Sequence, residues 1–415
     1  MAVFRPFAAV RPDARFAADT LCPPYDVVDH GEAAEIISQN PASFMNVTRA
    51  DAFFSQEDEY SDAVYERSRS NLTAFIEKGI YIEDAEPHFY IYSETLSGRT
   101  QTGIAGCASI DDYENGVIKK HEVTTPAKEA DRIKHFTACG ADTEPVFLTY
   151  RDVNGIDEIT KKIIAENDPD YEAEDVYGVT HRLWVVKDSE TNKKLTGLFD
   201  GVPAMYIADG HHRTASAVHV GMKMRSEDQD ASGDEEYNRF MAVAFPESEL
   251  RVLPYNRIVK TLNGLSVSDF LQRLDECADV AQIQDPGIFP SRRHTIYLYI
   301  GGSWYSAVFK ENLIDEDDPV KCLDVYLLQE HVLSPIIGID DPRRDERLEF
   351  SGGINGHKLL KDAVDSGSAA AAFELCPVTV SEIINVADSG MIMPPKSTWF
   401  EPKIGSGWFI HRIRK

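Results

Sequence analysis

Residues 204–220 read Ala-Met-Tyr-Ile-Ala-Asp-Gly-His-His-Arg-Thr-Ala-Ser-Ala-Val-His-Val, and they give the clearest local indication of a fold in the chain. The apolar run Met205–Ala208 is typical of a buried strand, and Asp209-Gly210 is a turn signal that ends it. Small and apolar residues then recur along 211–223, which predicts a helix lying against a sheet. Strand, tight glycine turn and helix in succession favour an α/β architecture.

This arrangement also favours phosphate binding. The first N–H groups of a helix have no partner within the helix, and the helix dipole adds positive potential there. Gly210 permits close backbone approach, His211–Arg213 add side-chain donors, and Thr214 offers a hydroxyl. Three cationic or polarisable side chains are unfavourably placed at the positive end of a helix unless an anion offsets them. We therefore expect the chemistry to centre on Asp209–Arg213.

Plainer interpretations of the same residues stay open. Asp209 could be an ordinary N-cap, and His211 and His212 could be solvated residues at an exposed helix end. A metal site is a third interpretation, but His212 and His219 lie about 10 Å apart along a helix and cannot share one ion. Asp209 and His211 could share one, yet the spacing shows no third ligand. No metal site is therefore predicted.

Two further segments carry candidate residues. In Lys119–Thr125, followed by Pro126 at a helix start, Glu122 could act as a general base on an alcohol; a charged loop is the alternative. In Met393–Thr398, the Lys396 ammonium and the Ser397 and Thr398 hydroxyls could close over an anion; a surface loop is equally compatible.

Composition excludes some classes of protein. At 415 residues the chain is long enough for two or three domains, and its net charge of −27 disfavours nucleic acid and anionic membranes as partners. The six cysteines are widely spaced without a C-x-x-C pair, which favours free thiols in a reducing compartment. No signal peptide and no apolar run of about 20 residues is evident, so we expect a cytoplasmic protein.

Periodicity predicts helices alternating with strands along the first 260 residues. The helices are expected at 56–79, 126–137, 154–166, 189–199 and 211–223, and the strands at 88–92, 102–108, 145–149, 183–186, 204–208 and 240–245. The first two strands should pair. Residues 22–27 should form a rigid extended turn, and 166–175 and 226–236 surface loops.

A second unit is expected from residue 261. Helices are predicted at 265–276, 322–334, 355–366 and 380–388, and strands at 278–283, 294–300, 304–309 and 369–375. Gly301-Gly302 should turn a hairpin. The fold class is therefore α/β or α+β, with the domains 1–95, a segment packing on the core; 96–260, the core; and 261–415, an α/β domain contributing to the cleft.

Five motifs together resemble the domain-of-unknown-function 1015 family from end to end: Cys22-Pro-Pro-Tyr-Asp-Val27, Lys119-Lys-His-Glu-Val-Thr124, Asp131-Arg132, Asp209-Gly-His-His-Arg213 and Leu253-Pro-Tyr-Asn-Arg257. Three pieces are also similar to the free serine kinases, which have a ParB/sulfiredoxin-like nucleotide-binding core and phosphorylate L-serine: His121-Glu122, Asp209–Arg213 and Pro395-Lys396-Ser397-Thr398. The chain departs from that pattern at Lys120 and at Trp399.

The resemblance implies a role for each matching residue. Glu122 would be the catalytic base, assisted by His212. Asp209–Arg213 and Thr214 would hold the nucleotide phosphates, with Lys396, Ser397 and Thr398 helping from the second domain. His121, Arg132, Tyr25 and Asp26 would bind the acceptor.

The leading hypothesis is phosphoryl transfer from ATP or ADP, with Mg²⁺, to the hydroxyl of a small metabolite, L-serine being the best guess. A non-catalytic nucleotide sensor is the alternative. A DNA-partition protein is disfavoured by the acidic charge and by the lack of a basic helix-turn-helix segment. A sulfiredoxin-like repair enzyme is disfavoured because His211 stands where the nucleophilic thiol would be. Monomer and homodimer both stay open.

Overall fold

The computed structural model describes residues 1–414, and these form two compact units. Unit 1 comprises Met1–Leu250 together with the C-terminal residues from Pro402, and unit 2 comprises Arg251–Glu401. The chain therefore leaves unit 1 once and returns to it at its C-terminal end.

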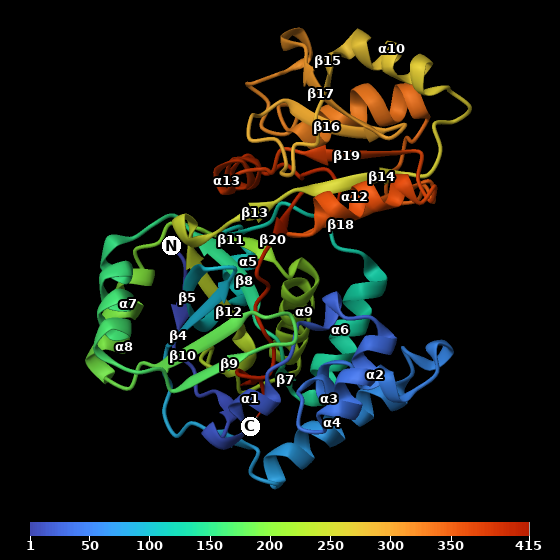
Figure 1. Cartoon of the computed structure of the whole chain (residues 1–415). Coiled ribbons are helices and arrows are strands. Elements are labelled where there is room, and N and C mark those ends of the chain that lie inside the picture. The colour runs from blue at the N-terminus through green and yellow to red at the C-terminus, as the bar shows by residue number, and fades with distance from the viewer. Residues whose placement is uncertain (415) are drawn as a thin grey trace. The chain divides into compact units, whose positions relative to one another are not determined.

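Unit 1 is built on a nine-stranded mixed sheet (Figure 1). The strands run in the order β6-β11-β8-β12-β5-β4-β10-β9, and β1 also pairs with β5. The pairs β11–β6 and β12–β8 are parallel, and the others are antiparallel. The bounds are β1 Phe4–Arg5, β4 Tyr90–Leu96, β5 Arg99–Ser109, β6 Ile118–Lys119, β8 Val146–Tyr150, β9 Tyr171–Glu174, β10 Thr180–Val185, β11 Met205–Asp209 and β12 Arg239–Pro246.

Helices lie on both sides of this sheet. In Figure 1, α7 (Asn154–Glu166) and α8 (Ser189–Phe199) lie together on one side, and α9 (His211–Glu227) and α6 (Pro126–Cys139) lie on the other. Helix α6 also packs against α4 (Asp62–Glu77). The shorter helices are α1 Ala17–Thr20, α2 His30–Gln39, α3 Met45–Thr48 and α5 Ile110–Glu114. Central strands such as β8 and β12 are buried almost throughout, because helices cover both of their faces.

Two small strand pairs complete unit 1. Strand β2 (Val10–Pro12) pairs with β3 (Tyr81–Glu83), and β7 (Ala141–Asp142) pairs with β21 (His411–Arg412). The second pair ties the C-terminal end of the chain to the core.

Unit 2 contains a six-stranded antiparallel sheet in the order β15-β17-β16-β19-β14-β18. A separate two-stranded pair joins β13 and β20. The strands are β13 Val252–Leu253, β14 Tyr255–Val259, β15 Ala278–Ile283, β16 Thr295–Ile300, β17 Ser303–Phe309, β18 Leu348–Gly352, β19 Ala371–Leu375 and β20 Trp399–Phe400. The helices are α10 Val267–Cys277, α11 Asp324–Leu328, the π-helical segment Gln329–Ile337, α12 Gly356–Asp365 and α13 Val380–Asp388.

The mixed α/β class predicted from the sequence is confirmed. Helices 154–166, 189–199 and 380–388 and strand 278–283 have the predicted bounds. Strands β4 and β5 pair as expected, with Tyr90 opposite Ala105. The Gly301-Gly302 hairpin is also confirmed, and both glycines have positive φ.

Several local predictions were wrong. The acidic segment 166–175 includes the edge strand β9, whose alternate residues Tyr171 and Ala173 are buried. The helix predicted at 56–79 begins only at Asp62. The helix predicted at 322–334 is α11 followed by a π-helical segment that contains Pro335, a residue without an N–H to donate. Within 22–27, Tyr25–Val27 form a 3-10 turn rather than extended chain.

The predicted segments distribute over the two units as follows. Residues 1–95 and 96–250 share one sheet, because β1 and β4 both pair with β5. Unit 2 begins at Arg251, shortly before the expected boundary at 261. The residues from Pro402 onward belong to unit 1.

No helix within residues 1–414 combines the length and the apolar character needed to cross a membrane.

All six cysteines in the described part of the chain are free thiols.

Candidate functional site

The turn after β11 has the backbone geometry that the sequence predicted. Asp209 is the last residue of β11, Gly210 has φ +91°, and α9 begins at His211. A side chain at 210 would be strained by this φ, and its Cβ would lie 2.9 Å from the Arg213 Nε atom. The N-cap of α9 is Gly210, and no side chain caps the helix, so the interpretation of Asp209 as an N-cap is wrong.

Arg213 turns inward and supports this turn. Its Nη1 donates to the Pro145 carbonyl at 2.7 Å, and its Nη2 donates to Asp209 Oδ2 at 2.9 Å. The other carboxylate oxygen of Asp209 accepts from Lys403 Nζ at 3.1 Å. Burial would raise the pKa of Asp209, but Lys403 and Arg213 outweigh it and hold that pKa below its usual range. Sequence reasoning gave Lys403 no role, because it lies far along the chain from Asp209.

His211 is held between His121 and Glu122. Its Nε2 accepts the backbone N–H of His121 at 3.5 Å, and the two imidazole rings meet edge to face at 4.6 Å. We therefore assign the ring proton to Nδ1, which lies 3.8 Å from Oε2 of Glu122. Burial lowers the pKa of His211 to about 3, so the ring is neutral at pH 7. Glu122 itself is about one-third exposed, at 34% of its side chain.

His121 is the most enclosed of these residues. Its side chain is fully buried, and burial together with His211 lowers its pKa to about 3. Among residues 1–414, no hydrogen-bond partner contacts either nitrogen of its ring. His121 thus contributes its backbone N–H to the site.

Two helix N-termini meet at His212. Its Nε2 accepts the backbone N–H of Thr125 at 3.0 Å, and Thr125 is the N-cap of α6. Neither α6 nor α9 has a side-chain cap, and α9 has no acidic residue in its first turn. Both helices therefore present first-turn N–H groups and positive dipole ends in one region. Burial and the nearby Lys128 lower the pKa of His212.

The charges in this region differ from the sequence expectation. His211 is neutral at pH 7, and the charge of Arg213 is compensated by Asp209. Positive charge comes instead from the two helix ends and from Lys403 and Lys128. The histidines are therefore positioned hydrogen-bonding groups rather than cations.

A cavity of about 280 Å³ in unit 1 brings together three of the four residues expected to bind the acceptor, Tyr25, Asp26 and Arg132. His121, the fourth, is not among the described residues that line it. Helix α6 joins the cavity to the α9 turn, since Lys128 lines the cavity and influences His212. Asp26 also links them: burial would lower the pKa of Lys403, but Asp209 and Asp26 raise it.

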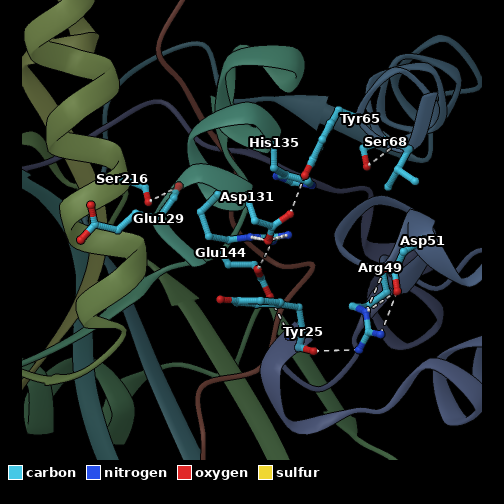
Figure 2. Close-up of polar contacts among 12 residues, drawn as sticks. Tyr25, Arg49, Asp51, Tyr65, Ser68, Glu129, Asp131, His135, Glu144 and Ser216 are labelled. Atoms are coloured by element: carbon cyan, nitrogen blue, oxygen red, sulfur yellow. Dashed lines mark hydrogen bonds and ion pairs between the residues drawn. The ribbon is translucent and has the colours of Figure 1, made fainter. Parts of the chain in front are cut away.

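The cavity wall is a network of charged and aromatic groups (Figure 2). The Arg132 guanidinium stacks on the Tyr25 ring at 4.1 Å and pairs with Asp131 at 2.7 Å. Tyr65 donates its hydroxyl to Asp131 at 2.9 Å. Arg49 pairs with Asp51 and donates to the Tyr25 carbonyl at 3.1 Å, as Figure 2 also shows.

Glu144 lies beneath this wall, and sequence reasoning missed it. It is 1% exposed, accepts the Tyr25 N–H at 3.0 Å and the Ser406 hydroxyl at 2.9 Å, and lies 3.8 Å from Arg132 Nη1. Burial raises the pKa of Glu144, although Arg213 and Arg132 act in the opposite direction. Its position was not recoverable from local pattern, because its partners come from three separate parts of the chain.

The remaining candidates, Lys396, Ser397 and Thr398, belong to unit 2. Lys396 has φ +57°, uncommon for a residue with a side chain, and its Nζ lies 5.3 Å from the centre of the Tyr255 ring. The Ser397 hydroxyl donates to the Pro394 carbonyl at 2.5 Å. Thr214, in α9 of unit 1, bonds the Gly210 carbonyl at 3.0 Å with its hydroxyl.

Within residues 1–414, no group of three or more histidine, cysteine, aspartate or glutamate side chains is arranged to hold a metal ion.

The fold and these contacts define a mixed α/β protein whose polar cluster lies where two helix N-termini meet. The chain belongs to the domain-of-unknown-function 1015 family: the family model, described as a protein of unknown function (DUF1015), matches residues 4–326. No curated protein matches the chain.

Three solved structures with some similarity to the chain can be named. A free serine kinase in complex with AMP is 14% identical with a TM-score of 0.35, and the match covers 70% of this chain and 85% of that one. A conserved hypothetical protein from Pyrococcus furiosus is 14% identical with a TM-score of 0.35, covering 72% and 91%. SbnI with a C-terminal truncation, from Staphylococcus aureus, is 10% identical with a TM-score of 0.39, covering 74% and 87%.

Proposed function

We propose that the chain is a nucleotide-dependent kinase that phosphorylates the hydroxyl of a small metabolite, with L-serine as the first acceptor to test and a ParB/sulfiredoxin-like core in unit 1. The observation that carries the proposal is the meeting of the uncapped N-termini of α6 and α9 at His212, beside the partly exposed Glu122 carboxylate. Phosphoryl transfer needs an anion site next to a base, and these groups supply both.

The donor groups fit a phosphate. Gly210 lets the Arg213 guanidinium lie close to the backbone of the turn, and the first-turn N–H groups of α9 have no capping side chain. Mg²⁺ accompanying a nucleotide would be held mainly by phosphate oxygens and water, because Asp209 already pairs with Lys403 and Arg213.

Glu122 is proposed as the general base. Its carboxylate would accept the hydroxyl proton as the acceptor oxygen bonds to phosphorus and the bond from phosphorus to the nucleotide breaks, which leaves ADP from ATP or AMP from ADP. His211 would orient this carboxylate through Nδ1. The acceptor would lie toward the cavity lined by Tyr25, Asp26 and Arg132.

The experiment is a turnover assay on the full-length protein with ATP or ADP, Mg²⁺ and a panel of small alcohols led by L-serine, read by ³¹P NMR. A new phosphomonoester that disappears in Glu122→Gln while nucleotide binding persists would support the proposal. The matched control is Glu158→Gln, an exposed carboxylate on α7, which should leave turnover unchanged. Nucleotide binding without turnover on any acceptor would favour a nucleotide sensor instead. Absence of nucleotide binding would contradict the phosphate site.

A further inference from the structure

Unit 2 contains a buried arginine without an acidic partner. Arg257, the last residue of the Leu253–Arg257 motif, is 3% exposed. Its Nη1 donates to the Tyr255 carbonyl at 2.7 Å, its Nη2 donates to the Pro395 carbonyl at 3.1 Å, and its guanidinium stacks on Phe350 at 4.6 Å. In the described part of the chain no carboxylate forms an ion pair with it.

The other buried arginines of residues 1–414 are neutralised. Arg132 pairs with Asp131 and Arg213 pairs with Asp209. The chain has 69 acidic side chains, so a buried guanidinium without an acidic partner is an exception that needs a physical reason. Burying an unpaired charge is costly, and two carbonyls could be held by a neutral donor.

Lys396 places a second cation beside Tyr255. The ammonium of Lys396 lies over the Tyr255 ring, and Tyr255 is the residue whose carbonyl Arg257 binds. Lys396 also adopts φ +57°, and such an outlier is often associated with function. The Trp399 ring meets the Tyr255 ring edge to face at 5.3 Å. Arg257 and Lys396 therefore both contact Tyr255, and an anion would relieve the repulsion between their charges.

We propose that Arg257 and Lys396 form a phosphate-binding subsite in unit 2, with Arg257 as its principal residue. A guanidinium has five N–H donors, and two of those of Arg257 are used on carbonyls, so it retains donors that suit phosphate oxygens. Burial lowers the pKa of Arg257 to about 9, which leaves it charged at neutral pH. The ligand is a phosphate group, either of the nucleotide or of the phosphorylated acceptor, and in this respect the inference rests on the proposed function.

The test is isothermal titration calorimetry of the full-length protein with two probes, ADP and O-phospho-L-serine, which distinguish the two sources of phosphate. Arg257→Met keeps an unbranched apolar stem against Phe350 and removes the guanidinium. We expect the dissociation constant of at least one probe to rise at least ~10-fold in Arg257→Met and in Lys396→Met. Arg347→Met is the matched control, because Arg347 also donates to two carbonyls in unit 2 but pairs with Asp345; it should bind like the wild type.

Wild-type affinity for both probes in a folded Arg257→Met would overturn the inference. If Arg257→Met does not fold, Lys396→Met is used instead, because Lys396 is exposed. Wild-type affinity of Lys396→Met for both probes would then overturn the inference. A wild-type protein that binds neither probe also overturns it. Turnover on an acceptor together with unchanged binding in both variants would reject the subsite and keep the kinase. Binding lost in both variants, without turnover on any acceptor, would keep the subsite and reject the kinase.

Discussion

Nδ1 of His211 lies 3.8 Å from Oε2 of Glu122, while Nε2 of the same ring accepts the backbone N–H of His121. One imidazole thus connects the start of α9 to the residue before Glu122. Because burial keeps this ring neutral, it acts on Glu122 as a fixed dipole rather than as a countercharge.

This relationship predicts that His211 positions Glu122. His211→Ala should lower kcat about 10- to 100-fold with little change in KM for the nucleotide, because Glu122 loses its orientation. His211→Asn, whose amide nitrogen lies near the position of Nδ1, should recover part of the loss. The profile of kcat against pH from 5 to 8 should keep its shape in His211→Asn, because a ring with a pKa of about 3 does not titrate there.

His219→Ala is the matched control for this series, since His219 is exposed on the same helix. An equal loss of kcat in His211→Asn and His211→Ala would argue against positioning through Nδ1.

Gly210 should be intolerant of any side chain. Gly210→Ala combines a φ of +91° with a Cβ 2.9 Å from Arg213 Nε, and we expect it to reduce the free energy of unfolding by about 1–3 kcal/mol. Gly197→Ala, in α8, has open space and an ordinary φ, and should stabilise by about 0.4–1 kcal/mol. Urea unfolding followed by circular dichroism measures both. Equal free energies for Gly210→Ala and the wild type would contradict the described turn.

Lys403 should stabilise the fold through Asp209. The pKa of Asp209 is lower in the folded state than in the unfolded chain, where it lies near 4. Its carboxylate therefore stabilises the fold at pH values above about 4, and this stabilisation is lost as the pH falls through the folded pKa. Lys403→Met should therefore cost about 1–2 kcal/mol at pH 7 and less below pH 4. Lys161→Met breaks the exposed pair with Asp157 and should change stability by less than about 0.5 kcal/mol. A pH-independent loss in Lys403→Met would point to lost packing instead.

His411 should make stability fall at alkaline pH. Its Nδ1 contacts Asp142 at 3.2 Å and its Nε2 contacts Glu236 at 2.9 Å, inside unit 1. Burial would lower the pKa of His411, but Cys107, Asp142 and Glu236 raise it well above its ordinary value. A raised folded pKa gives stability that is full below about pH 6.5 and is lost as pH rises through the folded value.

The measurement is the free energy of unfolding of the wild type and of His411→Gln at pH 6 and pH 9. His411→Gln should lose about 3–5 kcal/mol at pH 6, where it removes the imidazolium that contacts Asp142 and Glu236, and less at pH 9. The same loss at both values would mean that His411 acts as a packing group alone.

The sequence by itself determined the elements and the character of the candidate turn. Helix 154–166 and strand 278–283 were predicted from periodicity, because the spacing of apolar residues that each element requires can be seen in the local sequence. The turn at Asp209-Gly210 followed from the glycine at the end of an apolar run. Strands β9 and β18 were missed. Strand β9 lies in an acidic segment that favoured a surface loop, and β18 pairs with β14, which lies far away in the chain.

Only the tertiary structure decided which side chains meet and what charge they carry. Lys403 reaches Asp209 and Glu144 reaches Tyr25 because the sheet brings distant segments together. Burial then made His211 neutral, and the backbone N–H of His121 at its Nε2 places the ring proton on Nδ1. Local pattern records which residues prefer a strand or a helix, whereas pairing across the chain and the withdrawal of water from a side chain are properties of the folded whole.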